Sequence, residues 1–212
     1  MPDADPPVVV TISAPYGAGG SQVGPLVADR LGVTFLDRAI PAAVSEKLAL
    51  PLKEAIAADE NGPARLDRML RPFAAVGLAL AGAPATAELE ERTVADATEQ
   101  VLHELAERGG VILGRAGAVV LRDRPRALHV RLHGPPSRRI TQAMRIEGVD
   151  RAAAERRLEQ ADRARVAYVS HFYGVDPEDP DLYHLVVDST AIPLDAVAEL
   201  ILVAARAVDA AE

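Results

Sequence analysis

Residues 12–24 read ISAPYGAGGSQVG, a glycine-rich segment between an apolar run and an amphipathic run. The preceding residues, PPVVVT at 6–11, are typical of a buried strand, and LVADRLG at 26–32 has the apolar spacing of a helix. A strand, a glycine-rich turn and a helix favour anion binding, because backbone N–H groups and the helix N-terminus can face a phosphate. The segment therefore predicts a phosphate-binding loop over 14–21, although a tight turn packed by small residues fits the same pattern.

Strand and helix patterns alternate along most of the chain. Short apolar runs predict strands, and amphipathic runs predict the helices between them. The strands are expected at 7–13, 33–37, 111–114, 127–133 and 185–189, and the main helices at 21–31, 86–108, 135–146, 150–170 and 193–207. This alternation predicts an α/β fold with a parallel sheet covered by helices on both faces. Residues 40–95 show no strand pattern, so we expect a helical subdomain there.

Composition excludes several classes of protein. The chain has 212 residues, a net charge of −8 and no cysteine. An acidic chain is a poor candidate for nucleic-acid binding, and the absence of cysteine excludes disulfides, thiolate metal sites and a cysteine nucleophile. The N-terminus does not resemble a signal peptide and no apolar run has membrane-spanning length, so we expect a cytoplasmic protein without a membrane partner. His129 and His133 share one face of a predicted strand, where a polar strand end is a better interpretation than a metal pair.

The loop departs from the usual phosphate-loop pattern, Gly-x-x-x-x-Gly-Lys-Ser/Thr, at two positions. Ala14 stands where the first glycine belongs, and Gly20 stands where the lysine belongs. Ser21 retains the hydroxyl that binds Mg²⁺ in that pattern. Two arginines, Arg38 and Arg115, follow predicted strands, at the edge of the sheet where ligands bind in open α/β folds.

Several segments together resemble the nucleoside monophosphate kinases, specifically cytidylate kinase and the divergent cytidylate-kinase-like proteins. The resemblance covers nearly the whole chain apart from 50–95 and rests on the order and spacing of short motifs. The matching residues are Ser13, Tyr16, Gly17, Gly19 and Gly20; Asp37-Arg38; Gly114-Arg115; Asp162-Arg163-Ala164-Arg165; Phe172-Tyr173-Gly174; Asp179-Pro180; and Val187-Asp188-Ser189.

The resemblance implies a P-loop kinase-like fold in one domain, 1–212, with ATP as phosphoryl donor, Mg²⁺, and CMP, dCMP or a related monophosphate as acceptor. The core would be 7–39 and 96–212, the monophosphate-binding subdomain about 40–95, and the lid about 148–175. The implied site residues fall into three groups. The residues expected to hold ATP are Tyr16, Gly17, Ala18, Gly19, Gly20 and Ser21, and the Ser21 hydroxyl would also bind the metal. The residues expected to bind the acceptor are Asp37, Arg38, Arg115, Asp162 and Arg165. The catalytic positive charge would come from Arg163, Arg165 and Arg115.

Three departures from the family pattern bear on activity. The loop lysine is absent at Gly20, and Leu113 and Ala116 replace the two acids around Gly114-Arg115. The residues therefore leave two functions open: an active nucleoside monophosphate kinase, or a degenerate kinase that regulates by binding a nucleotide or a partner protein. Nucleotides are the expected ligands in both cases, and a homo-oligomer is left open. A lysine restored at position 20 is expected to raise or preserve phosphate affinity.

Overall fold

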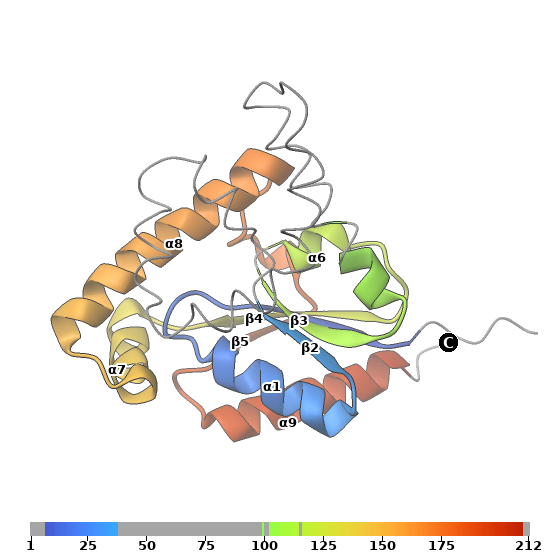
Figure 1. Cartoon of the computed structure of the whole chain (residues 1–212), viewed down its shortest axis with the longest axis horizontal. Helices are drawn as coiled ribbons and strands as arrows, with labels where there is room; N and C mark the ends of the chain where they lie inside the picture. Colours follow the sequence, from blue (N-terminus) through green and yellow to red (C-terminus); the bar gives the residue numbers. More distant parts are fainter. Residues whose placement is uncertain (1–6, 38–98, 100–101, 115, 210–212) are drawn as a thin grey trace, which may run out of the picture.

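The computed structural model describes residues 7–37, 99, 102–114 and 116–209. Strands and helices alternate through these residues (Figure 1). The elements are β1 (Val9–Ser13), α1 (Gly20–Leu31), β2 (Thr34–Asp37), β3 (Gly110–Leu113), α6 (Gly117–Val120), β4 (Ala127–His133), α7 (Pro136–Glu147), α8 (Arg151–Tyr173), the 3₁₀ turn η1 (Pro180–Leu182), β5 (Leu185–Asp188) and α9 (Leu194–Asp209). The predicted helical subdomain, 40–95, lies outside the described residues.

The five strands form one parallel sheet in the order β2-β3-β1-β4-β5. β1 is central and pairs with β3 on one side and β4 on the other, so that Ile12 lies beside Leu113 and Ser13 beside Arg131. Parallel strands bring their carboxyl ends to one edge, which is where open α/β sheets bind ligands. The predicted α/β fold, a parallel sheet with helices on both faces, is confirmed.

Helices cover both faces of the sheet (Figure 1). α1 and α9 pack on one face, where Val10 and Ile12 of β1 share the main core with Val23 and Val27 of α1 and with Ile201 of α9. On the other face Val9 and Ile112 pack with Leu121 and with the helical stretch at 102–106. Because β1 is fully buried between these layers, the loop that follows it is held at the centre of the sheet edge.

The helix after the loop begins and ends at glycines. Gly19 precedes α1 with a φ of 80°, and Gly32 ends it with a φ of 68°, a left-handed conformation that glycine adopts without steric cost. Inside α1, Gly24 allows a close approach to β2, because a Cβ there would overlap the Phe35 ring. α1 is therefore fixed against the sheet along its length.

The predicted lid segment corresponds mostly to one continuous helix, α8. Asp150 caps its N-terminus by accepting a hydrogen bond from the Ala153 N–H at 2.7 Å, and Gly174 ends it with a φ of 66°. α8 packs on α7 and, through Tyr168 and Val169, on Ala116 before α6. Its motion as a lid stays a prediction.

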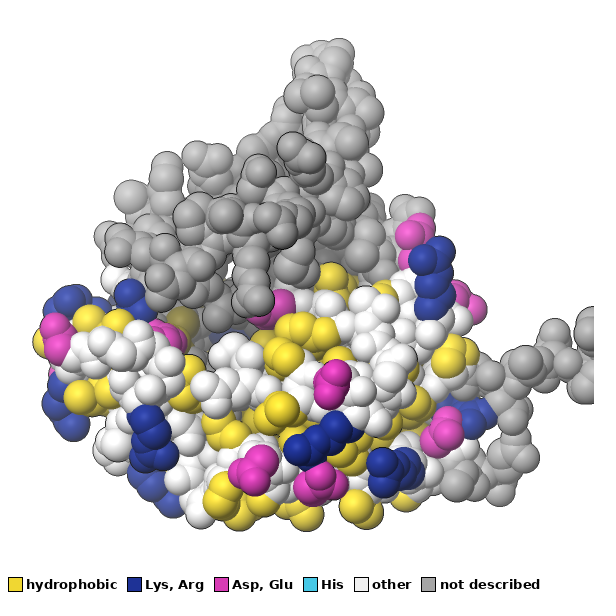
Figure 2. Space-filling view, turned by 60° about the horizontal axis from the view of Figure 1, so that its bottom comes forward, with side chains coloured by type: hydrophobic (Ala, Val, Ile, Leu, Met, Phe, Trp, Pro, Cys, Tyr) yellow, Lys and Arg dark blue, Asp and Glu magenta, His cyan; other side chains and the backbone are white. Residues whose placement is uncertain are grey.

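The face formed by α1 and α9 carries charges of both signs. Figure 2 shows Lys/Arg and Asp/Glu side chains interspersed there, and Arg30 of α1 forms an ion pair with Glu199 of α9. Such a mixed surface differs from the basic stripe that binds nucleic acid. Among the described helices, none combines the length and the apolar composition needed to cross a membrane.

Candidate functional site

The loop between β1 and α1 depends on two glycines in the left-handed region. Gly17 has a φ of 76° and Gly19 a φ of 80°. A Cβ on Gly17 would overlap the backbone carbonyl of Arg139, and a Cβ on Gly19 would lie 2.7 Å from Leu194 Cδ2. Both positions therefore exclude larger residues for steric as well as conformational reasons.

Three consecutive carbonyls of this loop accept hydrogen bonds from side chains of other elements. Arg139 Nη1 donates to Tyr16 O (2.9 Å), Gln142 Nε2 to Gly17 O (3.0 Å) and Ser189 Oγ to Ala18 O (2.7 Å). In contrast, the N–H groups of Gly19, Gly20 and Ser21 donate to no acceptor among the described residues. These free donors lie at the N-terminus of α1, where the helix dipole adds partial positive charge, so the loop is arranged to bind an anion.

The space that the loop lysine would enter is occupied. A Cβ on Gly20 would lie 2.6 Å from Ala14 Cβ and 2.8 Å from Leu113 Cδ1. Ala14 replaces the first glycine of the loop pattern, Gly20 replaces its lysine, and Leu113 replaces an acid. These three departures from the family pattern are separate in the sequence and are in contact in the structure. The Cβ of a lysine at position 20 would collide with Ala14, so the structure gives a reason to expect that this substitution alone does not preserve phosphate affinity.

A cleft of about 300 Å³ opens beside the loop at Pro15. Its lining carries three buried arginines from three elements, Arg131 of β4, Arg139 of α7 and Arg165 of α8. The same lining includes two acids, Asp162 and Glu178. Since arginines outnumber acids among the described residues of this lining, the cleft favours an anionic ligand.

Arg139 and Asp162 join the loop to α7 and α8. The Arg139 guanidinium donates to Gly134 O at 3.0 Å and to Tyr16 O at 2.9 Å, and it forms an ion pair with Asp162 Oδ2 at 2.8 Å. Asp162 Oδ1 accepts from the Tyr16 N–H at 3.3 Å. The predicted acceptor residue Asp162 thus holds the phosphate loop in this structure, and a role in contacting an acceptor stays a prediction.

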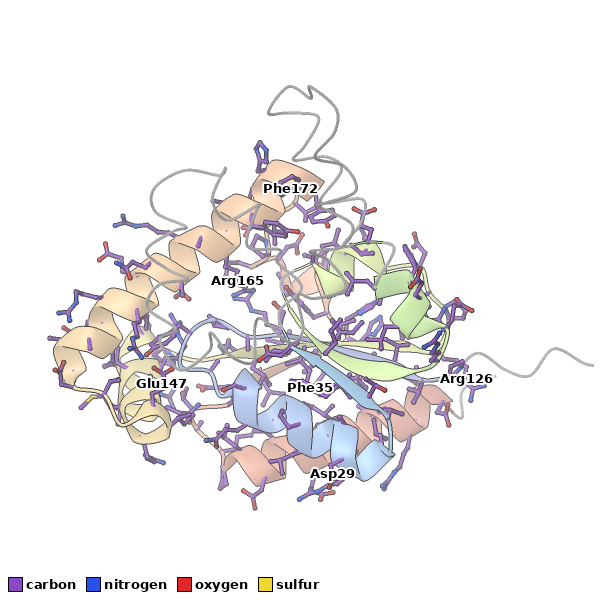
Figure 3. The ribbon with its side chains drawn as sticks, in the orientation of Figure 1. Asp29, Phe35, Arg126, Glu147, Arg165 and Phe172 are labelled. Carbon is purple, nitrogen blue, oxygen red and sulfur yellow. The ribbon has the colours of Figure 1, made fainter. Side chains whose placement is uncertain are left out.

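Arg165 points from α8 toward the sheet (Figure 3). Its Nη2 donates to Ser13 Oγ at 2.9 Å and to Pro177 O at 3.2 Å, and its Nη1 pairs with Glu178 Oε1 at 3.1 Å. Burial lowers the pKa of Arg165, partly offset by nearby Tyr183 and Glu178. The structure therefore brings Arg165 to the cleft, beside the strand that ends at Ser13.

The other predicted residues divide between the described and undescribed parts of the chain. Arg163 lies on the opposite, exposed side of α8, where it pairs with Glu159 and does not line the cleft. Asp37 ends β2 at the ligand-binding edge of the sheet, and Ser21 is exposed in the first turn of α1. Arg38 and Arg115 lie outside the described residues, so their proposed contacts stay predictions.

The sequence reasoning missed two of the three cleft arginines, Arg131 and Arg139. Arg131 interrupts the apolar strand ALHVRLH near its carboxyl end, and a charge in a buried strand signals a partner or a ligand. Arg139 stands in the first turns of α7, where it resembles an ordinary surface residue. Only Arg131 could have been found from the sequence pattern.

Tyr16 anchors the loop to the far end of α7. Its hydroxyl donates to Glu147 Oε2 at 2.6 Å, and Arg157 of α8 donates to the same oxygen at 2.7 Å. Burial, followed by the contact with Glu147, raises the pKa of the Tyr16 hydroxyl, so this phenol stays protonated. The tyrosine of the loop therefore positions the loop against α7 and α8.

His129 has a structural role. Its Nδ1 lies 2.8 Å from Thr11 Oγ1, and its ring stacks on His184 with centroids 4.8 Å apart. Burial and the neighbouring His184 lower the pKa of His129 to about 4. Within the described part of the chain no group of three metal-binding side chains occurs.

The phosphate loop after β1, the parallel sheet and the arginine-lined cleft define a P-loop kinase-like α/β protein. Residues 9–191 match the cytidylate kinase-like family, and the chain belongs to that family. It is 29% identical over 227 residues to the cytidylate kinase of Symbiobacterium thermophilum, covering 95% of this chain and 97% of that enzyme. A solved structure of an uncharacterized protein from Eubacterium ventriosum shares the fold, with a TM-score of 0.65 at 16% identity over 96% of this chain and 99% of that chain.

A further match is local. Over 104 residues the chain is 29% identical to the uronate isomerase of Corynebacterium glutamicum. The matched segment is 49% of this chain and spans only 20% of that enzyme's length.

Proposed function

We propose that this protein transfers the terminal phosphoryl group of ATP to a nucleoside monophosphate, CMP, dCMP or a related one. The observation that carries the proposal is the pairing of two anion-binding features at Pro15. On one side are the free N–H groups at the start of α1, and on the other is a cleft with three buried arginines. A reaction that joins two phosphorylated molecules needs two such features side by side, because its catalysis consists mainly of positioning and charge neutralisation.

In this proposal the loop N–H groups hold the phosphates of ATP, and Arg165 holds the phosphate of the acceptor. An oxygen of the acceptor phosphate attacks the γ-phosphorus, the bond to the β-phosphate oxygen breaks, and ADP and a nucleoside diphosphate leave. Mg²⁺ neutralises phosphate charge when it is bound, and most of its ligands would come from the nucleotide and water. The described residues fit this limited role, since the exposed Ser21 hydroxyl would supply one oxygen.

A second function, nucleotide binding without catalysis, is favoured by one observation. Ala14 and Leu113 fill the space of the lysine that would neutralise the transferring phosphoryl group. Loss of one such charge costs about 3–4 kcal/mol of transition-state stabilisation in comparable sites. A protein of this kind would sense nucleotide or regulate a partner.

Calorimetry and a transfer assay separate the two functions. We expect ATP to bind in the presence of Mg²⁺, and radiolabelled phosphate to pass from ATP to CMP or dCMP in preference to other monophosphates. ATP binding without transfer to any monophosphate, under every metal condition, would establish the non-catalytic function. Absence of both binding and transfer would contradict both.

A further inference from the structure

The arginine cleft contains a carboxylate that occupies the place of a ligand. Glu178 presents Oε2 to Arg131 Nη2 and Oε1 to Arg165 Nη1, so each carboxylate oxygen faces one guanidinium. The neighbouring carbonyl, Pro177 O, accepts hydrogen bonds from both arginines as well. The two carboxylate oxygens thus lie one on each guanidinium, which is the arrangement that two oxygens of a phosphoryl group would adopt.

The charges in this cluster are not balanced. Among the described residues, Asp162 pairs with Arg139 and also attracts Arg165 at longer range, and the Glu178 carboxylate is the one that pairs directly with both Arg131 and Arg165. Arg131 and Arg165 are 7% and 3% exposed, and the Arg165 Nε–H has no acceptor among the described residues. A buried guanidinium pair with one counter-charge binds a second negative charge favourably, so a phosphate dianion suits the pair better than a carboxylate does.

The position of Glu178 allows its side chain to move away from the two arginines. Its side chain is 51% exposed, whereas both of its arginine partners are buried. It lies in the connection between α8 and η1, where the Asp176 carboxylate accepts from the Glu178 N–H at 2.8 Å. Rotation of the Glu178 side chain toward solvent would therefore free Arg131 Nη2 and Arg165 Nη1, while the turn and the contacts of both arginines with Pro177 O stay in place.

We propose that Arg131 and Arg165 form a site for a phosphoryl group, and that Glu178 occupies this site until the phosphoryl group displaces it. The proposal rests on the proposed function for the identity of the ligand, a nucleoside monophosphate. It adds Arg131 as the second arm of the site and Glu178 as a built-in competitor. Competition of this kind weakens binding of the monophosphate by the free energy of the carboxylate contacts.

Calorimetry of the full-length protein with CMP, at constant ionic strength, tests the competition. Glu178→Gln removes the carboxylate and should tighten CMP binding about two- to fivefold, the upper part of the range expected for a half-exposed ion pair. The matched control, Glu155→Gln, removes an exposed acid that pairs with Arg151 elsewhere on α8, and it should change the affinity less than about twofold. Cytidine, which lacks the phosphoryl group, should bind all three proteins equally.

Inorganic phosphate separates this inference from the proposed function. Phosphate should bind Glu178→Gln more tightly than wild type, and the gain should disappear in the double variant with Arg131→Gln, whether or not any nucleotide is phosphorylated. Glu178→Asp, which keeps the charge but shortens the reach, should give a smaller gain in the same direction and covers the case in which Glu178→Gln does not fold. If Glu178→Gln and Glu178→Asp bind phosphate and CMP with the same affinities as wild type, the inference is overturned. Tightened phosphate binding without phosphoryl transfer would contradict only the proposed catalysis.

Discussion

The crowding around Gly20 predicts how a side chain at this position changes the free energy of unfolding. A Cβ on Gly20 would lie 2.6 Å from Ala14 Cβ, whose position is fixed by the backbone, and 2.8 Å from Leu113 Cδ1. We therefore expect Gly20→Ala to destabilise the protein although alanine is the better helix former. Crowding of this kind costs about 1–3 kcal/mol, against a gain of about 0.4–1 kcal/mol from reduced freedom of the unfolded chain.

The expected net loss is about 1–2 kcal/mol, which lowers the melting temperature by about 2–8 °C for a chain of this length. Urea unfolding followed by circular dichroism gives the free energy directly if the slope of the unfolding curve is unchanged. The control is the cycle with Ala14→Gly. Because the glycine at 14 removes the colliding methyl, the double variant should be more stable than the sum of the single changes by about 1 kcal/mol. A Gly20→Ala protein as stable as wild type, or an additive cycle, would refute the steric reasoning.

The same geometry predicts how a lysine can be restored. Gly20→Lys alone should destabilise the protein and should not raise its affinity for ATP. The triple variant with Ala14→Gly and Leu113→Asp opens the space and should bind ATP more tightly than Gly20→Lys alone. Calorimetry with ATP and Mg²⁺ measures both, and equal affinity in the two variants would show that Ala14 and Leu113 do not control the site.

Three further predictions concern residues around the site. His129 has a pKa of about 4 in the folded protein and about 6.5 in the unfolded chain, so it binds fewer protons when folded and stability should fall as the pH drops from about 6.5 toward 4. His129→Asn should remove up to about 2 kcal/mol of the stability that is lost between pH 7.5 and 5, measured by urea unfolding at both pH values. An identical loss of stability in the variant would contradict this prediction. Arg165→Lys should weaken CMP binding about tenfold or more. The Arg163 side chain is 69% exposed, so Arg163→Ala should leave the affinities for CMP and ATP within about twofold of wild type. A loss of turnover confined to Arg163→Ala would support the catalytic role that its sequence motif predicts. Tyr16→Phe should cost about 1–2 kcal/mol, because Glu147 loses a hydrogen bond at 2.6 Å, and in a Glu147→Gln background the same change should cost clearly less.

Much of the architecture could be predicted because local patterns carry it. The apolar runs gave the strands within one or two residues, and the helix predicted over 21–31 ends before Gly32 as expected. The phosphate loop was also visible, since its glycines are required by backbone geometry that depends on a few adjacent residues. These features are local in the chain, and short-range sterics and periodicity suffice to specify them.

The candidate site is a different case, because its contacts join side chains of different elements, and those of the loop join residues more than a hundred positions apart. Tyr16 meets Glu147, Arg139 holds a loop carbonyl, and Arg131 and Arg165 share Glu178. No local pattern distinguishes Arg139, which lines the cleft, from Arg138, which pairs with Asp188.

The sequence by itself determined the α/β alternation, the position of the phosphate loop and the departures at Ala14, Gly20 and Leu113. Only the tertiary structure decided that these three departures meet in one space and that two buried arginines face a carboxylate of the same chain. The physical reason is that side-chain periodicity is set by neighbours along the chain, whereas the register of parallel strands and the packing of helices on them set which distant side chains touch.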